Sequence, residues 1–200
     1  MNNEHYYTET PTSESRPAAA AFHYRGHDLT LTSDAGVFSR GELDAGTRIL
    51  LAALPQEISG AVLDLGCGWG PIGICIALEN PEASVTFADI NSRAVDLCKR
   101  NAEACHIQRA AFVQSDGFEA ISDAFDCIVT NPPIRAGKQK IYQMFADAKA
   151  HLNPGGALYL VIRKQQGAPS AIKYLSTLFS AVEVIDKSSG YWVIRCNEEA

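Results

Sequence analysis

From residue 61 onward, short apolar runs alternate with amphipathic segments of helix length. The runs predict strands at 61–65 (AVLDL), 84–89 (SVTFAD), 110–116 (AAFVQSD), 125–130 (FDCIVT) and 157–163 (ALYLVIR). The segments that follow them predict helices at 71–80, 91–105, 138–152 and 168–179. Such an alternation is typical of a mostly parallel sheet that helices cover on both faces.

The alternation stops near the C-terminus. The stretch AVEVIDKSSGYWVIRC (181–196) predicts two strands that a short Lys-Ser-Ser-Gly turn joins, with no helix between them. So short a connection cannot make a parallel crossover, and we expect the last strand to run antiparallel. We therefore predict an α/β fold with a Rossmann-like, doubly wound, mostly parallel sheet of seven strands, closed by one antiparallel strand of a C-terminal hairpin.

The N-terminal part of the chain has a different pattern. Ser, Thr, Pro and Glu dominate its first residues and an Ala run follows, so residues 1–20 are predicted to form a flexible tail. Residues 21–58 are predicted to form an N-terminal extension. It should contain a hairpin around Arg25-Gly26 and a helix from about Leu43 to Leu54.

The bulk composition is that of one globular domain. The chain has 200 residues, of which 46% are apolar, so we expect a single domain over residues 21–200 with its sheet core at 59–197. The sequence contains no run of about eighteen apolar residues, so we expect no membrane span, and the polar N-terminus does not resemble a secretory signal. The six cysteines lack metal-binding spacing, so we expect reduced thiols in a cytoplasmic protein without a metal site.

Charge is unevenly distributed. The whole chain has a net charge of −6, but residues 131–173 contain seven Lys and Arg residues and one Asp. This asymmetry indicates either a surface that faces a polyanion or a chance cluster of solvated cations.

A glycine-rich loop follows the first core strand. Gly68, Gly70 and Gly73 satisfy G-x-G-x-x-G, and Asp89 ends the next strand, a pattern that admits a dinucleotide site. Asp64 argues against a pyrophosphate, because its carboxylate would face the negative charge of the ligand. Asp64 suits a ligand with an ammonium group, or it orders the loop by binding backbone amides. Asp89 is expected to bind a ribose diol, unless it only caps the following helix.

Polar residues mark four strands of the predicted sheet. Each lies at or near the C-terminal end of its strand: Asp64, Asp89, Asp116 and Asn131. In a doubly wound sheet these ends meet at one edge, beyond which ligands bind. The sequence therefore predicts one ligand site that these residues share.

These motifs resemble the class I S-adenosylmethionine-dependent methyltransferases over roughly residues 30–196. The resemblance is carried by DLGCGWGPIG (64–73), the acid of FADI (87–90), the SDGF turn (115–118), NPPI (131–134) and the terminal hairpin. DAGVFSRGELDAGT (34–47) and NPPIRAGK (131–138) resemble the small-subunit (16S) ribosomal RNA guanine-N2 methyltransferases in particular. The resemblance implies S-adenosyl-L-methionine as cofactor, and ribosomal RNA or the small ribosomal subunit as partner.

The resemblance also assigns roles to residues. It implies that the cofactor is bound by Asp64, Gly66, Gly68, Gly70, Asp89, Ile90, Asp116, Gly117 and Asn131. It implies that Asn131 and Pro132 are catalytic. It implies that the substrate is bound by Pro133, Ile134, Arg135, Lys138, Arg163, Lys164 and Phe38, and that Asp44 to Thr47 line the cofactor or target pocket.

The Asn-Pro-Pro turn suits methylation of an amine. The exocyclic amine of guanine is a weak nucleophile because its lone pair is delocalised into the ring. The Asn131 side-chain oxygen and the Pro132 carbonyl could each accept one of its N–H bonds, which favours a pyramidal nitrogen and stabilises the positive charge of the transition state. The prolines would fix the direction of the carbonyl and add no competing donor.

Several alternatives stay open. The turn also suits adenine N6 or a protein glutamine amide, and the chain could instead be a non-catalytic RNA-binding assembly factor or an NAD(P)-dependent oxidoreductase. Related amine methyltransferases often have an aromatic residue after Asn-Pro-Pro, on which a flipped base stacks, and here Ile134 takes that position. Stacking of roughly 1–3 kcal/mol per base would then have to come from Arg135 or Phe38.

Overall fold

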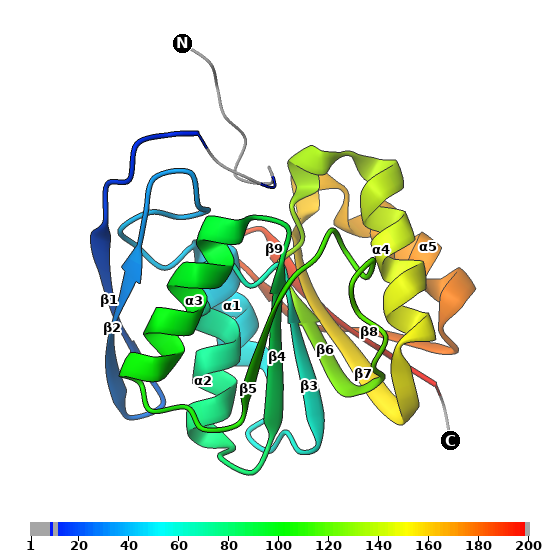
Figure 1. Ribbon diagram of the computed structural model, residues 1–200. Coiled ribbons are helices and arrows are strands. Elements are labelled where there is room, and N and C mark those ends of the chain that lie inside the picture. The colour runs from blue at the N-terminus through cyan, green and yellow to red at the C-terminus, as the bar shows by residue number, and fades with distance from the viewer. Residues whose placement is uncertain (1–8, 10–11, 199–200) are drawn as a thin grey trace.

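The computed structural model describes residue 9 and residues 12–198 of the chain. Over these residues, one seven-stranded sheet forms the body of the molecule, and two further strands form a separate hairpin (Figure 1). The strand order in the large sheet is β5-β4-β3-β6-β7-β9-β8. The predicted Rossmann-like α/β fold is confirmed.

The strands of the sheet agree with the apolar runs of the sequence. They are β3 (Ala61–Leu65), β4 (Ser84–Asp89), β5 (Ala110–Gln114), β6 (Phe125–Thr130), β7 (Leu152–Arg163), β8 (Ala181–Ser188) and β9 (Tyr191–Asn197). Strands β3 to β7 are parallel, whereas β9 is antiparallel to both of its neighbours, β7 and β8. The reversed C-terminal strand is therefore present as predicted.

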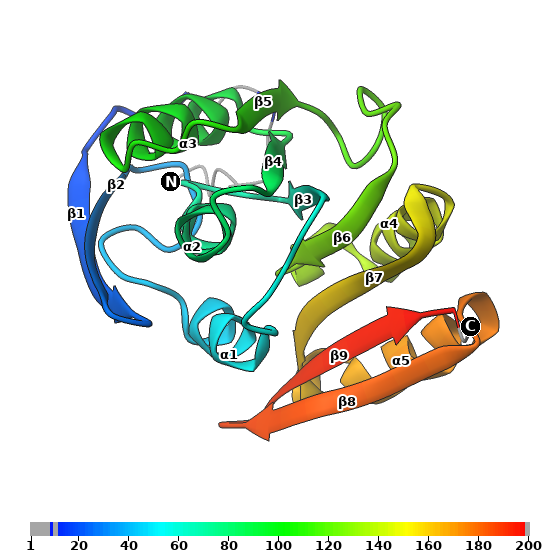
Figure 2. The same cartoon turned by 90° about the horizontal axis from the view of Figure 1, so that it is seen from below.

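Helices cover both faces of the sheet (Figure 2). One face carries α1 (Ala45–Ala53), α2 (Pro71–Glu79) and α3 (Ser92–Ala104), and the other carries α4 (Lys138–Ala150) and α5 (Ala168–Leu178). The one-turn helices η1 (Ile134–Ala136) and η2 (Lys164–Gln166) precede α4 and α5. Each face has its own cluster of buried apolar side chains. Helix α2 is apolar on all sides because it is buried between α1, α3 and the sheet.

The N-terminal hairpin consists of β1 (Ala18–Tyr24) and β2 (His27–Ser33), joined at Arg25-Gly26 as predicted. Its apolar side belongs to the same buried cluster as α1, α2 and α3. The predicted helix of the extension is α1, which Asp44 caps by accepting a hydrogen bond from the backbone amide of Thr47.

The predicted flexible tail is wrong for its last residues. β1 begins at Ala18, and the hydroxyl of Ser15 and the backbone amide of Arg16 both donate to the carboxylate of Asp34. Asp34 is buried and needs such donors, so the segment before β1 is held against the domain. Residues 1–8 and 10–11 of the predicted tail lie outside the described residues.

Strand β7 also begins earlier than the predicted residue 157. Leu152 pairs with Phe125, and the register of β6 and β7 then shifts between Phe125 and Cys127. The Asn-Pro-Gly-Gly stretch that follows Leu152 is therefore an irregular part of the strand.

Gly73 allows α2 to lie close to β4. A Cβ atom at residue 73 would lie 2.3 Å from Cε1 of Phe87, whose ring is fully buried and stacks on Phe112. The missing side chain thus sets the spacing between helix and sheet beneath the loop that joins β3 to α2.

We expect Gly73→Ala to destabilise the fold by about 1–3 kcal/mol, because the added methyl group would overpack the contact with Phe87. At a helix position without this contact, the same change would stabilise the fold by up to about 1 kcal/mol. A loss of stability would therefore identify overpacking against Phe87 as the cause. Urea unfolding measures the effect. The cost should be smaller in a Phe87→Leu background, and an equal cost in both backgrounds would contradict the packing explanation.

Candidate active site

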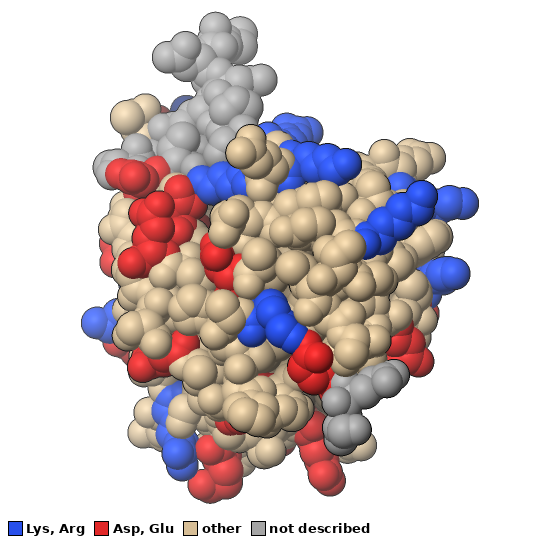
Figure 3. All heavy atoms as spheres, turned by 90° about the vertical axis from the view of Figure 1, so that its right-hand side faces the viewer, with Lys and Arg blue, Asp and Glu red and all other residues tan. Residues whose placement is uncertain are grey.

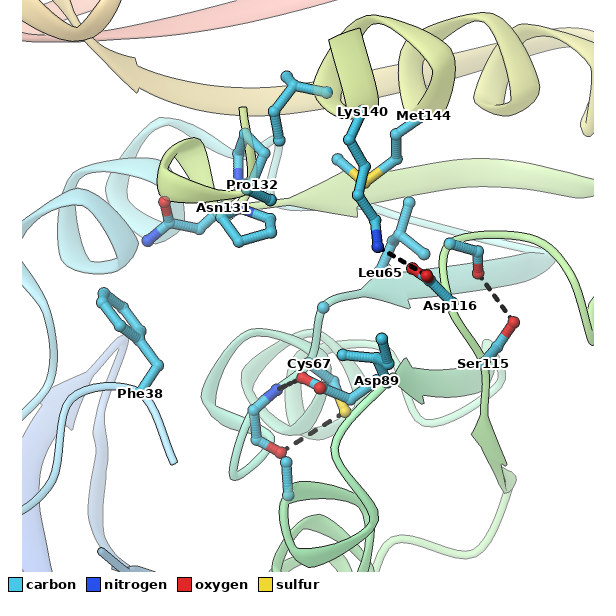
Figure 4. Close-up of a pocket in the computed structure, with 18 of the residues that line it drawn as sticks. Phe38, Leu65, Cys67, Asp89, Ser115, Asp116, Asn131, Pro132, Lys140 and Met144 are labelled. Carbon is cyan, nitrogen blue, oxygen red and sulfur yellow. Dashed lines mark hydrogen bonds and ion pairs between the residues drawn. The ribbon is translucent and has the colours of Figure 1, made fainter. Parts of the chain in front are cut away.

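A cavity of about 950 Å³ opens at the carboxyl edge of the sheet, where the loops after β3, β4, β5 and β6 meet (Figure 4). Strand β3 lies between β4 and β6. After β3 the chain turns toward one face of the sheet, and after β6 it turns toward the opposite face. Ligands bind at such a divergence in doubly wound sheets. The volume is near the top of the range for small-molecule sites, about 300–1,000 Å³, which leaves room for a substrate group beside a nucleotide-sized cofactor.

Most of the predicted site residues line this cavity. They are Phe38, Gly66, Gly68, Asp89, Ile90, Asp116, Gly117, Asn131, Pro132, Pro133 and Lys138. The remaining predicted residues lie outside its wall: Asp64, Gly70, Ile134, Arg135, Arg163 and Lys164.

The loop after β3 presents its backbone to the cavity. Gly66 and Gly68 have φ values of 73° and 55°, and the space that their Cβ atoms would fill is open. The backbone amides of Gly66 and Cys67 donate to the carbonyl of Ala88 at 2.8 and 3.0 Å, which ties the loop to the end of β4. A ligand can therefore approach this loop closely, and the fit is that expected for the predicted cofactor.

The Asp89 carboxylate lies beside this loop. Its two oxygens accept the backbone amides of Gly68 at 2.8 Å and Asn91 at 2.9 Å. Burial raises the pKa of Asp89, although these amide donors oppose the shift. The carboxylate lines the cavity and can accept a further hydrogen bond there, as contact with a ribose hydroxyl requires. The side chain of Asn91, not that of Asp89, caps α3, so the alternative role of Asp89 as a helix cap is wrong.

Asp64 lies beneath the loop. Its side chain is 0% exposed, and Oδ2 accepts the backbone amide of Gly73 in the first turn of α2 at 2.8 Å. Among the described residues, no group donates to Oδ1. Burial, together with the charge of Asp89, raises the pKa of Asp64 to about 7. The position of Asp64 corrects the predicted contact with the cofactor and favours the alternative, in which the carboxylate orders the loop and the start of α2.

Two other predicted residues also serve packing. Gly70 caps α2 with a φ of 92°, and a Cβ atom there would lie 2.6 Å from Sγ of Cys98. Ile134 packs against the apolar cluster on the α4–α5 face. The position at which related amine methyltransferases often have an aromatic residue is therefore not part of the cavity wall here.

The predicted basic residues lie outside the cavity, apart from Lys138. All four are exposed: Arg135 in η1, Lys138 at the start of α4, Arg163 at the end of β7 and Lys164 in η2. Lys and Arg side chains gather at the top of the face that carries α4 and α5 (Figure 3). The guanidinium of Arg163 also stacks over the ring of Tyr191, 5.4 Å from its centroid.

An ion pair closes one side of the cavity. Nζ of Lys140, from α4, lies 2.6 Å from Oδ2 of Asp116, from the loop after β5 (Figure 4). No sequence motif assigned a role to Lys140. In the sequence, the one indication for Lys140 was its position in the basic stretch. Its contact with Asp116 could not be predicted because it depends on how α4 crosses the end of β5.

The Asn131 amide is held from one side. Its Nδ2 donates to Oδ2 of Asp44 at 3.0 Å and to Oγ1 of Thr47 at 2.9 Å. Both N–H bonds are thus used, and the side-chain oxygen is left as an acceptor at the cavity wall. Thr130, directly before Asn131, donates its hydroxyl to the carbonyl of Leu65 at 2.7 Å and joins the ends of β6 and β3.

Phe38 is the one large apolar side chain that is well exposed among the described residues, at 38%. It lies with Asn131 on one side of the pocket, opposite Lys140 and Asp116 (Figure 4). The indole N–H of Trp69 donates to the carbonyl of Phe38 at 3.0 Å, which fixes the backbone of an otherwise exposed loop.

Two further findings concern the described residues as a whole. These residues include no group of three or more His, Cys, Asp or Glu side chains placed to hold a metal ion. None of the helices formed by residues 12–198 combines the length and the apolar character that crossing a membrane requires.

The Rossmann-like sheet, its reversed last strand and the cavity at its carboxyl edge are the features expected of a methyltransferase that uses S-adenosylmethionine. The family model described as "Methyltransferase small domain" matches residues 28–195, and the chain belongs to this family. The predicted class of enzyme and its cofactor are thereby confirmed.

Three relatives are informative. The chain is 43% identical over 199 residues to the uncharacterised protein YbxB of Bacillus subtilis, and the match covers 98% of this chain and 99% of that one. It is 40% identical over 138 residues to ribosomal RNA small subunit methyltransferase C of Haemophilus influenzae, over 67% of this chain but 42% of that protein. The solved 16S rRNA N2 G1207 methyltransferase of T. thermophilus, in complex with AdoMet and guanosine, has a TM-score of 0.82 at 29% identity and matches 94% of this chain and 52% of that one.

The raised pKa of Asp64 predicts a pH dependence of stability. The folded protein keeps the Asp64 proton up to about pH 7, whereas the unfolded chain loses it near 3.8. The stabilisation from this group is therefore complete below about pH 4 and is lost as the pH rises to about 7.

Asp64→Asn cannot titrate and keeps an acceptor for Gly73. The free energy of unfolding of the wild type minus that of the variant should fall between about pH 4 and pH 7 and then level off. Urea unfolding of both proteins at a series of pH values measures this difference. A difference that stays constant over this range would contradict the raised pKa.

Proposed function

We propose that this chain methylates the exocyclic N2 amine of a guanine in small-subunit ribosomal RNA, with residues 18–197 acting as one methyltransferase domain. The observation that carries the proposal is the position of Asn131 in the wall of the cavity, where α1 accepts both of its side-chain N–H bonds and leaves the amide oxygen available as an acceptor. The solved relative that holds AdoMet and guanosine, and the relative named for the small subunit, support the choice of substrate.

The residues that would hold the cofactor fit it chemically. When bound, S-adenosylmethionine supplies a sulfonium methyl group, which the amine lone pair takes while the C–S electron pair stays on sulfur. Gly66 and Gly68 allow a close approach of the ligand to the backbone, and Asp89 has lone pairs free for the ribose. Ile90, Asp116 and Gly117 would line the rest of the cofactor site.

Asn131 and Pro132 would hold the amine. The amide oxygen and the Pro132 carbonyl each accept one N–H bond, so the nitrogen lone pair points away from both acceptors and toward the methyl group. The same acceptors stabilise the positive charge that develops on nitrogen. The cationic product then loses one N–H proton to water, so no strong general base is required.

Phe38 would provide the surface on which the base stacks. A base-modifying enzyme takes its target out of the stack, and an exposed ring at the pocket mouth replaces part of the lost stacking. Pro133 would support the other edge of the base. This role for Phe38 fits the finding that Ile134 does not line the cavity.

The basic residues around the cavity would hold RNA phosphates. Arg135 and Lys138 lie just beyond Asn131 in the sequence. Arg163 ends the neighbouring strand β7, and Lys164 begins η2. Cations at the rim attract a polyanion whatever its sequence, while the pocket selects the base. A substrate of this kind agrees with the predicted cytoplasmic location, which stays a prediction.

The proposed function predicts a single product. Small ribosomal subunits from a strain that lacks this protein, incubated with the purified protein and labelled S-adenosylmethionine, should gain N2-methylguanosine, detected by nucleoside mass spectrometry. Label in N6-methyladenosine or in a protein glutamine would instead select one of the alternative acceptors. Cofactor binding without transfer to RNA, DNA or ribosomal protein would indicate a non-catalytic assembly factor.

Asn131→Ala is the matched control. At saturating cofactor and substrate, turnover should fall by about 10²-fold, on the order of 3 kcal/mol, because one acceptor of the transition-state charge is removed. Unchanged turnover would exclude the amide from the chemistry even if the product were correct.

The basic rim predicts a salt dependence of RNA binding. Arg163→Ala/Lys164→Ala should weaken binding and reduce the slope of log K against log salt by about 0.7 for each phosphate of single-stranded RNA that the protein no longer neutralises. Fluorescence anisotropy at several salt concentrations measures the slope, and calorimetry should give an unchanged cofactor affinity.

The pair Lys99 and Arg100 provides the comparison, since both are exposed basic neighbours on α3, away from this rim. Lys99→Ala/Arg100→Ala should leave the slope as in the wild type. Equal slopes for all three proteins would mean that Arg163 and Lys164 do not contact the RNA.

A further inference from the structure

The orientation of the Asn131 amide depends on residues outside the Asn-Pro-Pro motif. The two acceptors for its Nδ2 are Oδ2 of Asp44 at 3.0 Å and Oγ1 of Thr47 at 2.9 Å. Both belong to the start of α1, in the N-terminal extension, far from Asn131 in the sequence. Thr47 is 4% exposed, so its contact with the amide is shielded from water.

These two acceptors do not have the same effect on the amide. The hydroxyl of Thr47 can either donate or accept, so by itself it would bind either end of the Asn131 amide. A carboxylate oxygen only accepts, and an amide oxygen turned toward Asp44 would meet like charge without a hydrogen between them. Asp44 therefore distinguishes the two orientations, and Thr47 follows it.

The same oxygen of Asp44 has a second donor. Oδ2 also accepts the backbone amide of Thr47 at 3.0 Å, which is the N-cap hydrogen bond of α1. A backbone N–H can only donate, so the atom at this place must be an acceptor. The backbone amide of Thr47 thus holds the Asp44 oxygen in the place where it accepts from Asn131.

The surroundings hold this oxygen in place. A Cβ atom at residue 46 would lie 3.0 Å from Oδ2 of Asp44 and 3.0 Å from Cε1 of Tyr191, so Gly46 leaves just enough space for the carboxylate. Helix α1 packs against β7 and β9, which are inner strands of the sheet, each paired on both sides. The acceptor for Asn131 is therefore attached to the rigid core.

We propose that Asp44, supported by Thr47, is a positioning residue for methyl transfer: it fixes the Asn131 amide with its oxygen toward the amine of the substrate. This inference rests on the proposed function, in which that oxygen accepts an amine N–H. Donation from Nδ2 to a carboxylate also polarises the amide and makes its oxygen a stronger acceptor, as hydrogen bonds in a chain do.

Asp44→Ser separates positioning from helix capping. Serine caps helices as well as aspartate does, but its side chain is too short to cap α1 and reach Asn131 together. Turnover should fall by about tenfold or more, as when only about a tenth of the molecules keep the productive orientation. Melting temperature and cofactor affinity should stay close to those of the wild type. Asp44→Asn keeps an oxygen for the Thr47 amide, and therefore for Asn131, and should restore turnover to within about threefold.

Asp126 offers a matched control at the opposite end of the sheet. Its carboxylate accepts the backbone amide of Ala61 at 2.7 Å and Nδ2 of Asn153 at 2.9 Å, the same two kinds of donor that Asp44 has, here on two different oxygens. Asp126→Ser should leave turnover unchanged. A similar loss of turnover in Asp126→Ser and Asp44→Ser, or a loss that Asp44→Asn does not reverse, would overturn the proposal.

A measurement without substrate tests the same point independently of activity. The side-chain NH₂ signals of Asn131, assigned by their absence in Asn131→Ala, should exchange with water more slowly in the wild type than in Asp44→Ser. Equal exchange rates would show that Asp44 does not hold the amide. If exchange changes as expected while the wild type yields no methylated product, the proposed function fails and the positioning role of Asp44 stands.

Discussion

The divergence of the chain on either side of β3 is the constraint on which the rest of the structure depends. Right-handed crossovers place α2 and α3 on one face of the sheet and α4 and α5 on the other, so the loops after β3 and β6 must part. The hydroxyl of Thr130 donates to the carbonyl of Leu65, which keeps the two strands joined up to the point of separation. The cavity therefore lies between two strand ends that the sheet itself holds in place.

Most of this frame could be predicted because a parallel strand buried on both faces has to be apolar along its length. An apolar run then ends where its strand leaves the core, and the next polar residue lies at the edge of the sheet. For this reason Asp89, Asp116 and Asn131 could be placed at one cavity from the sequence. The same rule failed at the start of β7, where proline and glycine continue a strand only because a register shift absorbs them.

The direction of a side chain was harder to predict than the position of its backbone. Asp64 and Asp89 both belong to the ends of buried strands, but Asp64 precedes the last residue of β3, and its carboxylate turns under the loop to the amide of Gly73. Gly70 likewise belongs to the glycine motif and yet serves packing against Cys98. A local motif contains no information on which of its residues face a ligand and which face a neighbouring helix.

The contact between Asp44 and Asn131 shows a second limit, since no local pattern relates residues so far apart. It also changes the meaning of the N-terminal extension. On the proposed function, an amide without this restraint would also turn its donor toward the amine, and the donor would oppose the developing charge. The strands position the Asn131 backbone, but they leave the two ends of its side chain equivalent in shape. The oxygen and nitrogen ends of the amide can be distinguished only by a group that can only donate or only accept. The carboxylate of Asp44, which caps α1, only accepts, and a backbone amide of α1 holds this carboxylate in place. On the proposed function, the extension is therefore part of the catalytic arrangement, because without it the sheet would fix where the amide lies but not which end of it faces the substrate.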